Sequence, residues 1–186
     1  MNFRSCRKSY ERILTRPKSR HNQFALVALG NLHWKIGLTT PKTRDDNYKR
    51  AGELFAKALE LKPGNLFAAN GLGIVLALKK MWTDSRDIFL ACKQESGLID
   101  LWINLAIAYL ELGQYASSMN CVDYCLTRAS KSQMFELIML KAKCYFCQGK
   151  NERNEEVFEK ALKELTQVQG PIIQRLYTTN SLLIVR

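Results

Sequence analysis

One apolar position recurs along the sequence at nearly constant intervals, with a short side chain four residues before it. The position is occupied by Tyr10, Phe55, Phe89, Val122 and Phe158, so the successive steps are 45, 34, 33 and 36 residues. Such a period is typical of stacked copies of one helical unit, because a single unit of this length cannot bury its own apolar face. The sequence therefore predicts a repeat array and excludes one compact domain.

A second pattern interleaves with the first and predicts where each repeat turns. A small residue ends each of the pairs Leu29-Gly30, Leu72-Gly73, Leu105-Ala106 and Lys141-Ala142. Seven residues after these small residues come Gly37, Lys80, Gly113 and Gly149. Glycine readily adopts the left-handed backbone that ends many helices. We therefore expect the first helix of each hairpin to end at these four positions.

The period near 34, together with the helix that carries Trp102, Leu105, Ala106 and Tyr109, resembles tetratricopeptide (TPR) repeats. The resemblance implies an all-α fold, a right-handed TPR superhelical solenoid of stacked helical hairpins with a concave inner surface. The predicted helices are 3–14, 21–36, 46–61, 66–79, 83–94, 99–112, 115–128, 134–148, 152–167 and 172–185. The predicted units are a lone second helix at 1–17, TPR repeats at 21–63, 66–97, 99–130 and 134–168, and a lone first helix at 171–186.

The step of 45 residues indicates an insertion in the first complete repeat. The surplus falls at 38–47, which contains Pro41 and several charged residues, so we expect an inserted loop between the two helices of that hairpin. The predicted array also opens on a second helix and closes on a first helix, without polar capping repeats. We therefore expect the sequence to be a segment of a longer solenoid.

Positive charge is concentrated at the N-terminal end of the sequence. The formal net charge is +11, and residues 1–50 contribute 12 basic against 3 acidic side chains. The cluster Arg4, Arg7, Lys8 and Arg12 is compatible with phosphate contacts to a nucleic acid, with a solvated helix face, or with a face that meets acidic residues of a preceding repeat. Because no stacking aromatics interleave the cluster, we favour the last two interpretations over nucleic acid.

The first helix of each TPR unit lines the concave surface, and its side chains here are mostly apolar. The candidate partner-binding groove consists of Phe67, Asn70, Ile74, Ile103, Ile107, Met139 and Lys143. Such a groove suits an extended or helical segment of a protein partner, whereas the alternative is that these side chains pack within the array. Arrays that bind acidic C-terminal peptides of chaperones need Lys and Asn at several positions, and only Asn31, Lys35, Asn70 and Lys143 are available, so we disfavour a co-chaperone.

The sequence predicts neither a metal site nor an enzyme. The spacings of Cys121, Cys125, Cys144 and Cys147 are compatible with four zinc ligands, but on adjacent helices they equally suit buried thiols, which we favour. The two histidines have no nucleophile at a useful spacing, and no phosphate-binding glycine loop or paired-carboxylate motif is found. We therefore expect no cofactor, no small-molecule substrate, no secretory signal and no membrane span.

Several blocks between the repeat positions are more specific than the repeat requires. They are Tyr10–Leu14, Ala28–Asn31, Pro41–Asp45, Asn65–Ala77, Arg86–Phe89 and Asp100–Ala106. In this order they resemble the large TPR scaffold subunit of the polymerase-associated factor (PAF) complex, from about residue 7 to 165. The resemblance implies a nuclear, non-enzymatic scaffold that binds other PAF subunits during RNA polymerase II elongation and promotes histone H2B ubiquitination and histone methylation. The alternative is a generic TPR adaptor, such as a co-chaperone or a transport-complex subunit.

Overall fold

The computed structural model describes residues 3–19, 21–93 and 98–166, and every regular element in these ranges is a helix. The prediction of an all-α TPR fold is confirmed. The chain divides into two compact units, residues 1–92 and residues 93–186. The predicted helix 172–185, and with it the predicted unit 171–186, lies outside the described residues.

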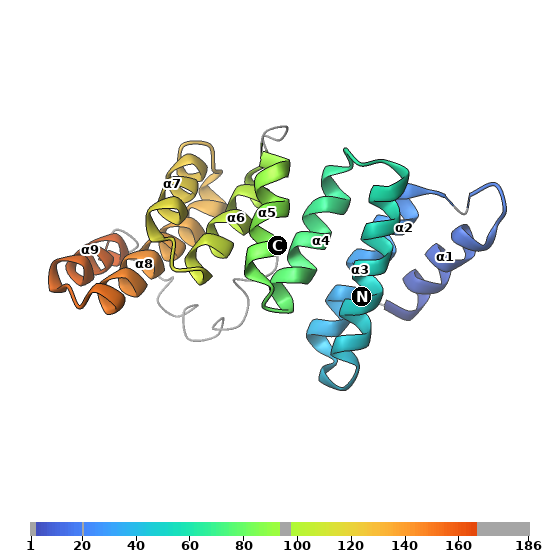
Figure 1. The fold of residues 1–186 in the computed structure, drawn as a ribbon, viewed down its shortest axis with the longest axis horizontal. Helices are drawn as coiled ribbons and strands as arrows, with labels where there is room; N and C mark the ends of the chain where they lie inside the picture. Colours follow the sequence, from blue (N-terminus) through green and yellow to red (C-terminus); the bar gives the residue numbers. More distant parts are fainter. Residues whose placement is uncertain (1–2, 20, 94–97, 167–186) are drawn as a thin grey trace. The chain divides into compact units, whose positions relative to one another are not determined.

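The first unit is built from successive helices that pack in antiparallel pairs (Figure 1). It contains α1 (Phe3–Thr15), α2 (Gln23–Thr39), the short 3-10 helix η1 (Pro41–Thr43), α3 (Arg44–Leu61), α4 (Leu66–Leu78) and nearly all of α5 (Trp82–Lys93). In addition to these pairs, α2 packs directly against α4. A contact between every second helix stacks one hairpin on the next, as a TPR array requires.

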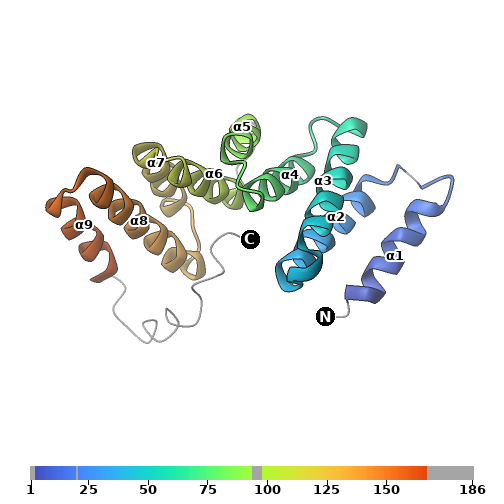
Figure 2. The ribbon, with the colours of Figure 1, turned by 60° about the horizontal axis from the view of Figure 1, so that its bottom comes forward.

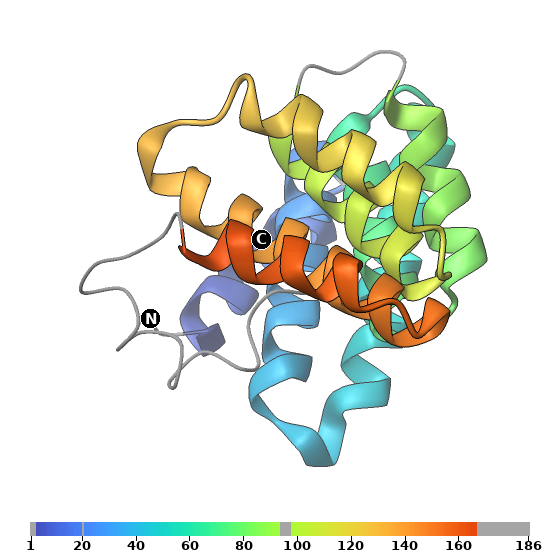
Figure 3. The ribbon, with the colours of Figure 1, turned by 90° about the vertical axis from the view of Figure 1, so that its left-hand side faces the viewer.

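The second unit repeats this arrangement. It contains α6 (Ile99–Glu111), α7 (Tyr115–Leu126), α8 (Lys131–Glu152) and α9 (Glu155–Thr166). Figure 2 and Figure 3 show α9 running beside α8, and α6 contacts both α7 and α8. The predicted helices therefore recur at the expected places, although α8 begins three residues earlier and ends four residues later than predicted.

A buried aromatic ring organises the first unit. Phe55 on α3 is fully buried, and its ring lies over Gly30 of α2 and Gly71 of α4, so that a Cβ added at either glycine would approach the ring to 2.7 and 2.4 Å respectively. Phe89 on α5 lies in the same way over Gly73, at 2.4 Å from such a Cβ. The aromatic ring at this recurrent position therefore occupies space that is free only because the facing residues are glycines.

Two of the four glycine-type turn positions are not turns. Lys80 and Gly113 have the predicted left-handed backbone, with φ of 61° and 72°. Gly37 and Gly149, however, lie inside α2 and α8, where their missing side chains admit the rings of Tyr48 and Phe158. The turn prediction was wrong for these two glycines because both helices continue past them.

The inserted residues 38–47 do not form a loop. Thr39 ends α2, η1 follows after one residue, and α3 begins at Arg44, so the insertion lengthens the two helices of one hairpin. Arg44 Nε donates to the carbonyl oxygen of Gly37 at 3.4 Å, and the ring of Tyr48 packs against Gly37. Helix–helix packing thus extends into the inserted segment.

We expect Gly71→Val to lower the free energy of unfolding by about 1–3 kcal/mol, the usual cost of overpacking a core. Phe55 has no free volume to move into because it is enclosed by two helices. Thermal or denaturant unfolding followed by circular dichroism measures the effect. Gly64→Val is the matched control, since nothing lies within 4 Å of a Cβ at Gly64. Equal stability of the two variants would contradict the packing role of Gly71.

Candidate functional site

The predicted groove residues of the first unit differ sharply in exposure. Phe67 on α4 is 67% exposed, Asn70 is half-buried, and Ile74 is only 4% exposed. On α2, at the position equivalent to Phe67, Phe24 is 75% exposed. The two most exposed large apolar side chains described in this unit are therefore phenylalanines at the starts of the two first helices.

The starts of α2 and α4 are built alike. Asn22 and Asn65 cap them, with each Oδ1 accepting from a backbone N–H, that of Ala25 at 2.9 Å and that of Ala68 at 3.1 Å. Asn capping fixes the point at which a helix begins, and the exposed phenylalanine follows the cap by two residues in both helices. Of the two, only Phe67 was among the predicted groove residues, although the shared Asn-x-Phe-Ala pattern of 22–25 and 65–68 marks both positions in the sequence.

The starts of these two helices are also joined. Asn65 Nδ2 donates to Gln23 Oε1 at 3.4 Å, and α2 packs along α4. Two capped helix starts are thus held side by side, each with a solvent-facing phenylalanine. We call Phe24 and Phe67 the phenylalanine pair.

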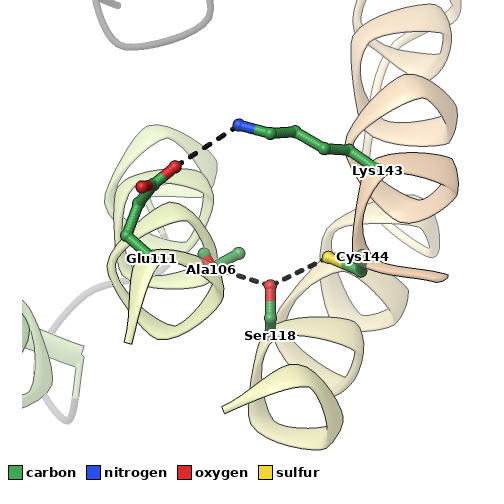
Figure 4. Close-up of polar contacts among 5 residues, drawn as sticks. All are labelled: Ala106, Glu111, Ser118, Lys143 and Cys144. Atoms are coloured by element: carbon green, nitrogen blue, oxygen red, sulfur yellow. Dashed lines mark hydrogen bonds and ion pairs between the residues drawn. The ribbon is translucent and has the colours of Figure 1, made fainter. Parts of the chain in front are cut away.

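In the second unit the predicted groove is crossed by an ion pair (Figure 4). Lys143 Nζ on α8 lies 3.4 Å from Glu111 Oε1 on α6, and Ile103 and Met139 are half-buried. Both charged side chains are substantially exposed, so the pair contributes little stability. Lys143 is therefore engaged by its neighbouring helix.

The assignment of Ile74 and Ile107 to the groove is corrected by their burial. Ile107 is 7% exposed and Ile74 is 4% exposed, so neither offers a partner an apolar surface. The first helices of successive repeats pack on one another, α2 on α4 and α6 on α8, so side chains on these helices can be buried within the array.

The polar positions that a chaperone-binding array would use are also engaged. The Trp34 indole N–H donates to Asn31 Oδ1 at 3.1 Å, and Lys35 Nζ lies 5.6 Å from the centroid of the Trp34 ring. Lys143 is paired to Glu111 through an exposed contact.

The predicted basic patch lies on α1. Lys8 and Arg12 are exposed, and Arg4 precedes Lys8 by one turn of the same helix. Arg7 is half-buried, with its Nε 3.6 Å from Glu11 Oε1. The opposite side of α1 packs Cys6, Tyr10 and Leu14 on the core of α2 and α3.

The cysteines of the second unit line its interior. Cys121, Cys125 and Cys144 are buried, and Cys144 Sγ lies 3.1 Å from Ser118 Oγ, which also donates to the carbonyl oxygen of Ala106 at 2.7 Å (Figure 4). Burial, with smaller contributions from Cys121 and Asp100, raises the pKa of Cys125 to about 12. Within the described ranges, no group of three or more His, Cys, Asp or Glu side chains is placed to hold a metal ion.

Two clusters in the second unit were not anticipated from the sequence. Trp102 of α6 stacks on Tyr124 of α7 at 3.7 Å between centroids, and the Arg128 guanidinium lies 3.9 Å from the centroid of the Tyr124 ring. Lys141 of α8 reaches Asp123 at 2.9 Å and Glu164 at 3.3 Å. Although burial disfavours its charge, these two carboxylates raise the pKa of Lys141 overall. Both clusters tie neighbouring helices together.

No described helix combines the length and the apolar character needed to cross a lipid bilayer.

We expect Ile107→Glu to unfold the second unit, because a carboxylate at this buried site costs several kcal/mol. The helical circular dichroism signal at 25 °C and the midpoint of thermal unfolding should both fall. Leu162→Glu is the control, since Leu162 is 62% exposed and should tolerate the charge. A fully folded Ile107→Glu variant would return Ile107 to the list of partner contacts.

We expect Cys125 to resist alkylation by iodoacetamide in the folded protein at mildly alkaline pH. The reactive species is the thiolate, and both burial and a pKa near 12 keep Cys125 protonated. The half-buried Cys147 should be labelled faster, and denaturant should equalise the two. Peptide mass spectrometry over a time course measures both rates, and equal labelling in the native protein would contradict the burial of Cys125.

Comparison with protein families places a TPR repeat at residues 99–132, which covers α6, α7 and the start of α8. Solved structures agree on the fold. The crystal structure of MamA protein matches with a TM-score of 0.65 at 16% identity, over 97% of this chain and 88% of that one. A MamA structure from Desulfovibrio magneticus RS-1 matches with a TM-score of 0.55 at 18% identity, over 96% and 97%. At these identities the likeness concerns the fold alone.

Curated relatives share one name. RNA polymerase-associated protein CTR9 of Caenorhabditis elegans is 32% identical over 143 residues, 75% of this chain and 12% of that protein. The Saccharomyces cerevisiae protein of the same name is 27% identical over 77% and 14%, and the Arabidopsis thaliana CTR9 homolog 27% over 67% and 12%. The chain spans about an eighth of the length of these relatives. The chain therefore has a TPR fold, and most of it is similar in sequence to a segment of proteins named CTR9.

Proposed function

We propose that this chain is a non-enzymatic protein interaction scaffold and acts as part of a CTR9-type subunit of the PAF complex. The observation that carries the proposal is the 32% identity to a protein named as RNA polymerase-associated, extending over three quarters of the chain. TPR arrays generally bind segments of other proteins along their helices, which agrees with such a role.

The side-chain chemistry supports a binding role over a catalytic one. In the described part of the chain, the conspicuous polar groups serve as helix caps, inter-helix ion pairs and buried hydroxyl contacts, as with Asn65, Lys141 and Ser118. By contrast, the phenylalanine pair exposes large apolar surface without any partner group of its own unit to cover it. Burying one such side chain in an interface is worth about 1.5–3 kcal/mol.

The finer parts of the proposal come from the family resemblance. They are a nuclear location, association with other PAF subunits and through them with RNA polymerase II, and a role in elongation that promotes histone H2B ubiquitination and histone methylation. A generic TPR adaptor, such as a co-chaperone or a transport-complex subunit, is the competing function. The small number of suitable groove residues, Asn31, Lys35, Asn70 and Lys143, speaks against its co-chaperone form.

Affinity purification from eukaryotic nuclear extract tests the proposal. The tagged chain should recover PAF subunits and RNA polymerase II, identified by mass spectrometry and quantified against an unrelated TPR array of similar length. The comparison matters because any TPR array recovers some proteins through general apolar contacts. Recovery of chaperones or transport subunits in place of PAF subunits would overturn the proposal in favour of the adaptor.

A further inference from the structure

The phenylalanine pair is surrounded by segments that carry cations and no acids. The chain segments that lead into α2 and α4, residues 16–19 with 21–23 and residues 61–65, contain the exposed cations Arg16, Lys18 and Lys62, and no Asp or Glu within these described ranges. The nearest acids along the chain are Glu60, in the last turn of α3, and Glu11, which is paired to Arg7. Positive charge therefore predominates where the two phenylalanines emerge.

The fold holds these segments together at one end of the first unit. The α1–α2 turn is fixed by Ser19 Oγ, which donates to the carbonyl oxygen of Ile13 at 3.0 Å, and by the Asn22 N–H, which donates to the carbonyl oxygen of Ser19 at 2.9 Å. The α3–α4 turn is joined to it through the bond from Asn65 to Gln23. Because α1 packs antiparallel to α2, the exposed Arg12 near the end of α1 lies at this same end.

The second unit lacks this combination. Phe24 and Phe67 lie six residues before the small residues Gly30 and Gly73, and at the same distance before Ala106 and Ala142 the second unit has Asp100 and Glu136. The equivalent positions thus carry acids in place of phenylalanine. An exposed phenylalanine at this repeat position is therefore found in the first unit and not in the second, and it is not a consequence of the repeat pattern.

We propose that this end of the first unit, formed by Phe24, Phe67, Arg12, Arg16, Lys18 and Lys62, binds a protein segment in which apolar side chains are flanked by acidic residues. The apolar side chains cover the phenylalanine pair, and the carboxylates face the cations around it. Charge complementarity of this kind selects among apolar segments and accelerates association. The inference rests on the proposed scaffold function and specifies the chemistry of the partner segment.

A protein segment fits these groups better than a nucleic acid does. A nucleic-acid strand could contact these cations through its phosphates. Phenylalanine rings at the starts of two parallel helices can stack on bases, but they can equally bury the aliphatic side chains of a protein segment. Among the described residues of this region no further Phe, Tyr or Trp side chain is exposed to extend a stacking platform, and His21 adds a single imidazole ring. The proposed ligand is therefore the acidic and apolar peptide, and a single-stranded nucleic acid is tested against it.

The test uses the full 186-residue chain and short fluorescein-labelled peptides measured by fluorescence anisotropy. The main probe alternates leucine with glutamate; one control probe replaces each glutamate with lysine, another replaces each leucine with serine, and a single-stranded oligouridine completes the set. We expect the leucine–glutamate peptide to bind most tightly and to weaken as salt rises. Phe24→Ala/Phe67→Ala and Lys18→Glu/Lys62→Glu should each reduce its affinity about tenfold or more.

Matched variants separate the proposed surface from general effects. Leu162→Ala removes an exposed apolar side chain, and Lys150→Glu/Lys163→Glu reverses two exposed charges, both in the second unit. These variants should bind the peptide as the unchanged chain does, and circular dichroism should show all variants folded. Three results would each overturn the inference. The control variants could weaken peptide binding as much as the surface variants do, or the lysine peptide could bind equally well. Oligouridine could also bind more tightly, with an affinity that Phe24→Ala/Phe67→Ala leaves unchanged.

The same variants distinguish this inference from the proposed function. If Phe24→Ala/Phe67→Ala and Lys18→Glu/Lys62→Glu recover PAF subunits from nuclear extract as fully as the unchanged chain, this surface is not the partner site and the scaffold role stands. If the unchanged chain recovers no PAF subunits, the proposed function fails, and peptide binding alone then decides the chemistry of the surface.

Discussion

The structure of the first unit depends on the contact between an aromatic ring and bare helix backbone. Phe55 reaches Gly30 on one first helix and Gly71 on the next, and both glycines are needed because a Cβ at either would overlap the ring. Close packing in protein interiors leaves no volume to absorb such an overlap. This contact therefore limits how α3 packs against the first helices α2 and α4 of two successive repeats.

The second unit satisfies the same geometry with different chemistry. Val122 takes the place of the ring, Ala106 and Ala142 stand near the glycine positions, and Ser118 donates across to the carbonyl oxygen of Ala106. Ser85 makes the equivalent bond to Gly73 in the first unit, at 2.9 Å, so a buried hydroxyl is shared where the aromatic ring is not. Ion pairs around Lys141 add further contacts between the helices, so the second unit holds its hairpins together with different residue types.

Periodicity predicted what depends on residue spacing. Helix positions from α1 to α9 follow from the recurring small and aromatic residues, and the all-α fold follows from the helices. Burial of Ile74 and Ile107 could not be predicted in the same way, because it depends on how closely two first helices approach, and that distance is set by Phe55 and its counterparts. Likewise, the sequence does not distinguish a glycine that ends a helix from one that, like Gly37, lies inside a helix and makes room for the ring of Tyr48. The capped phenylalanines were visible in the sequence as a repeated Asn-x-Phe-Ala, but their exposure was not.

The insertion at 38–47 bears on how such an array tolerates change in length. Since the added residues extend α2 and α3 together, they continue the hairpin along its own axis and leave the Phe55 contact untouched. The length of such a hairpin can vary at its tip while the packing at its other end stays the same. Residues can therefore be gained or lost there without disturbing the neighbouring repeats, which makes the tip of α2 and α3 the place where related arrays are free to diverge in size.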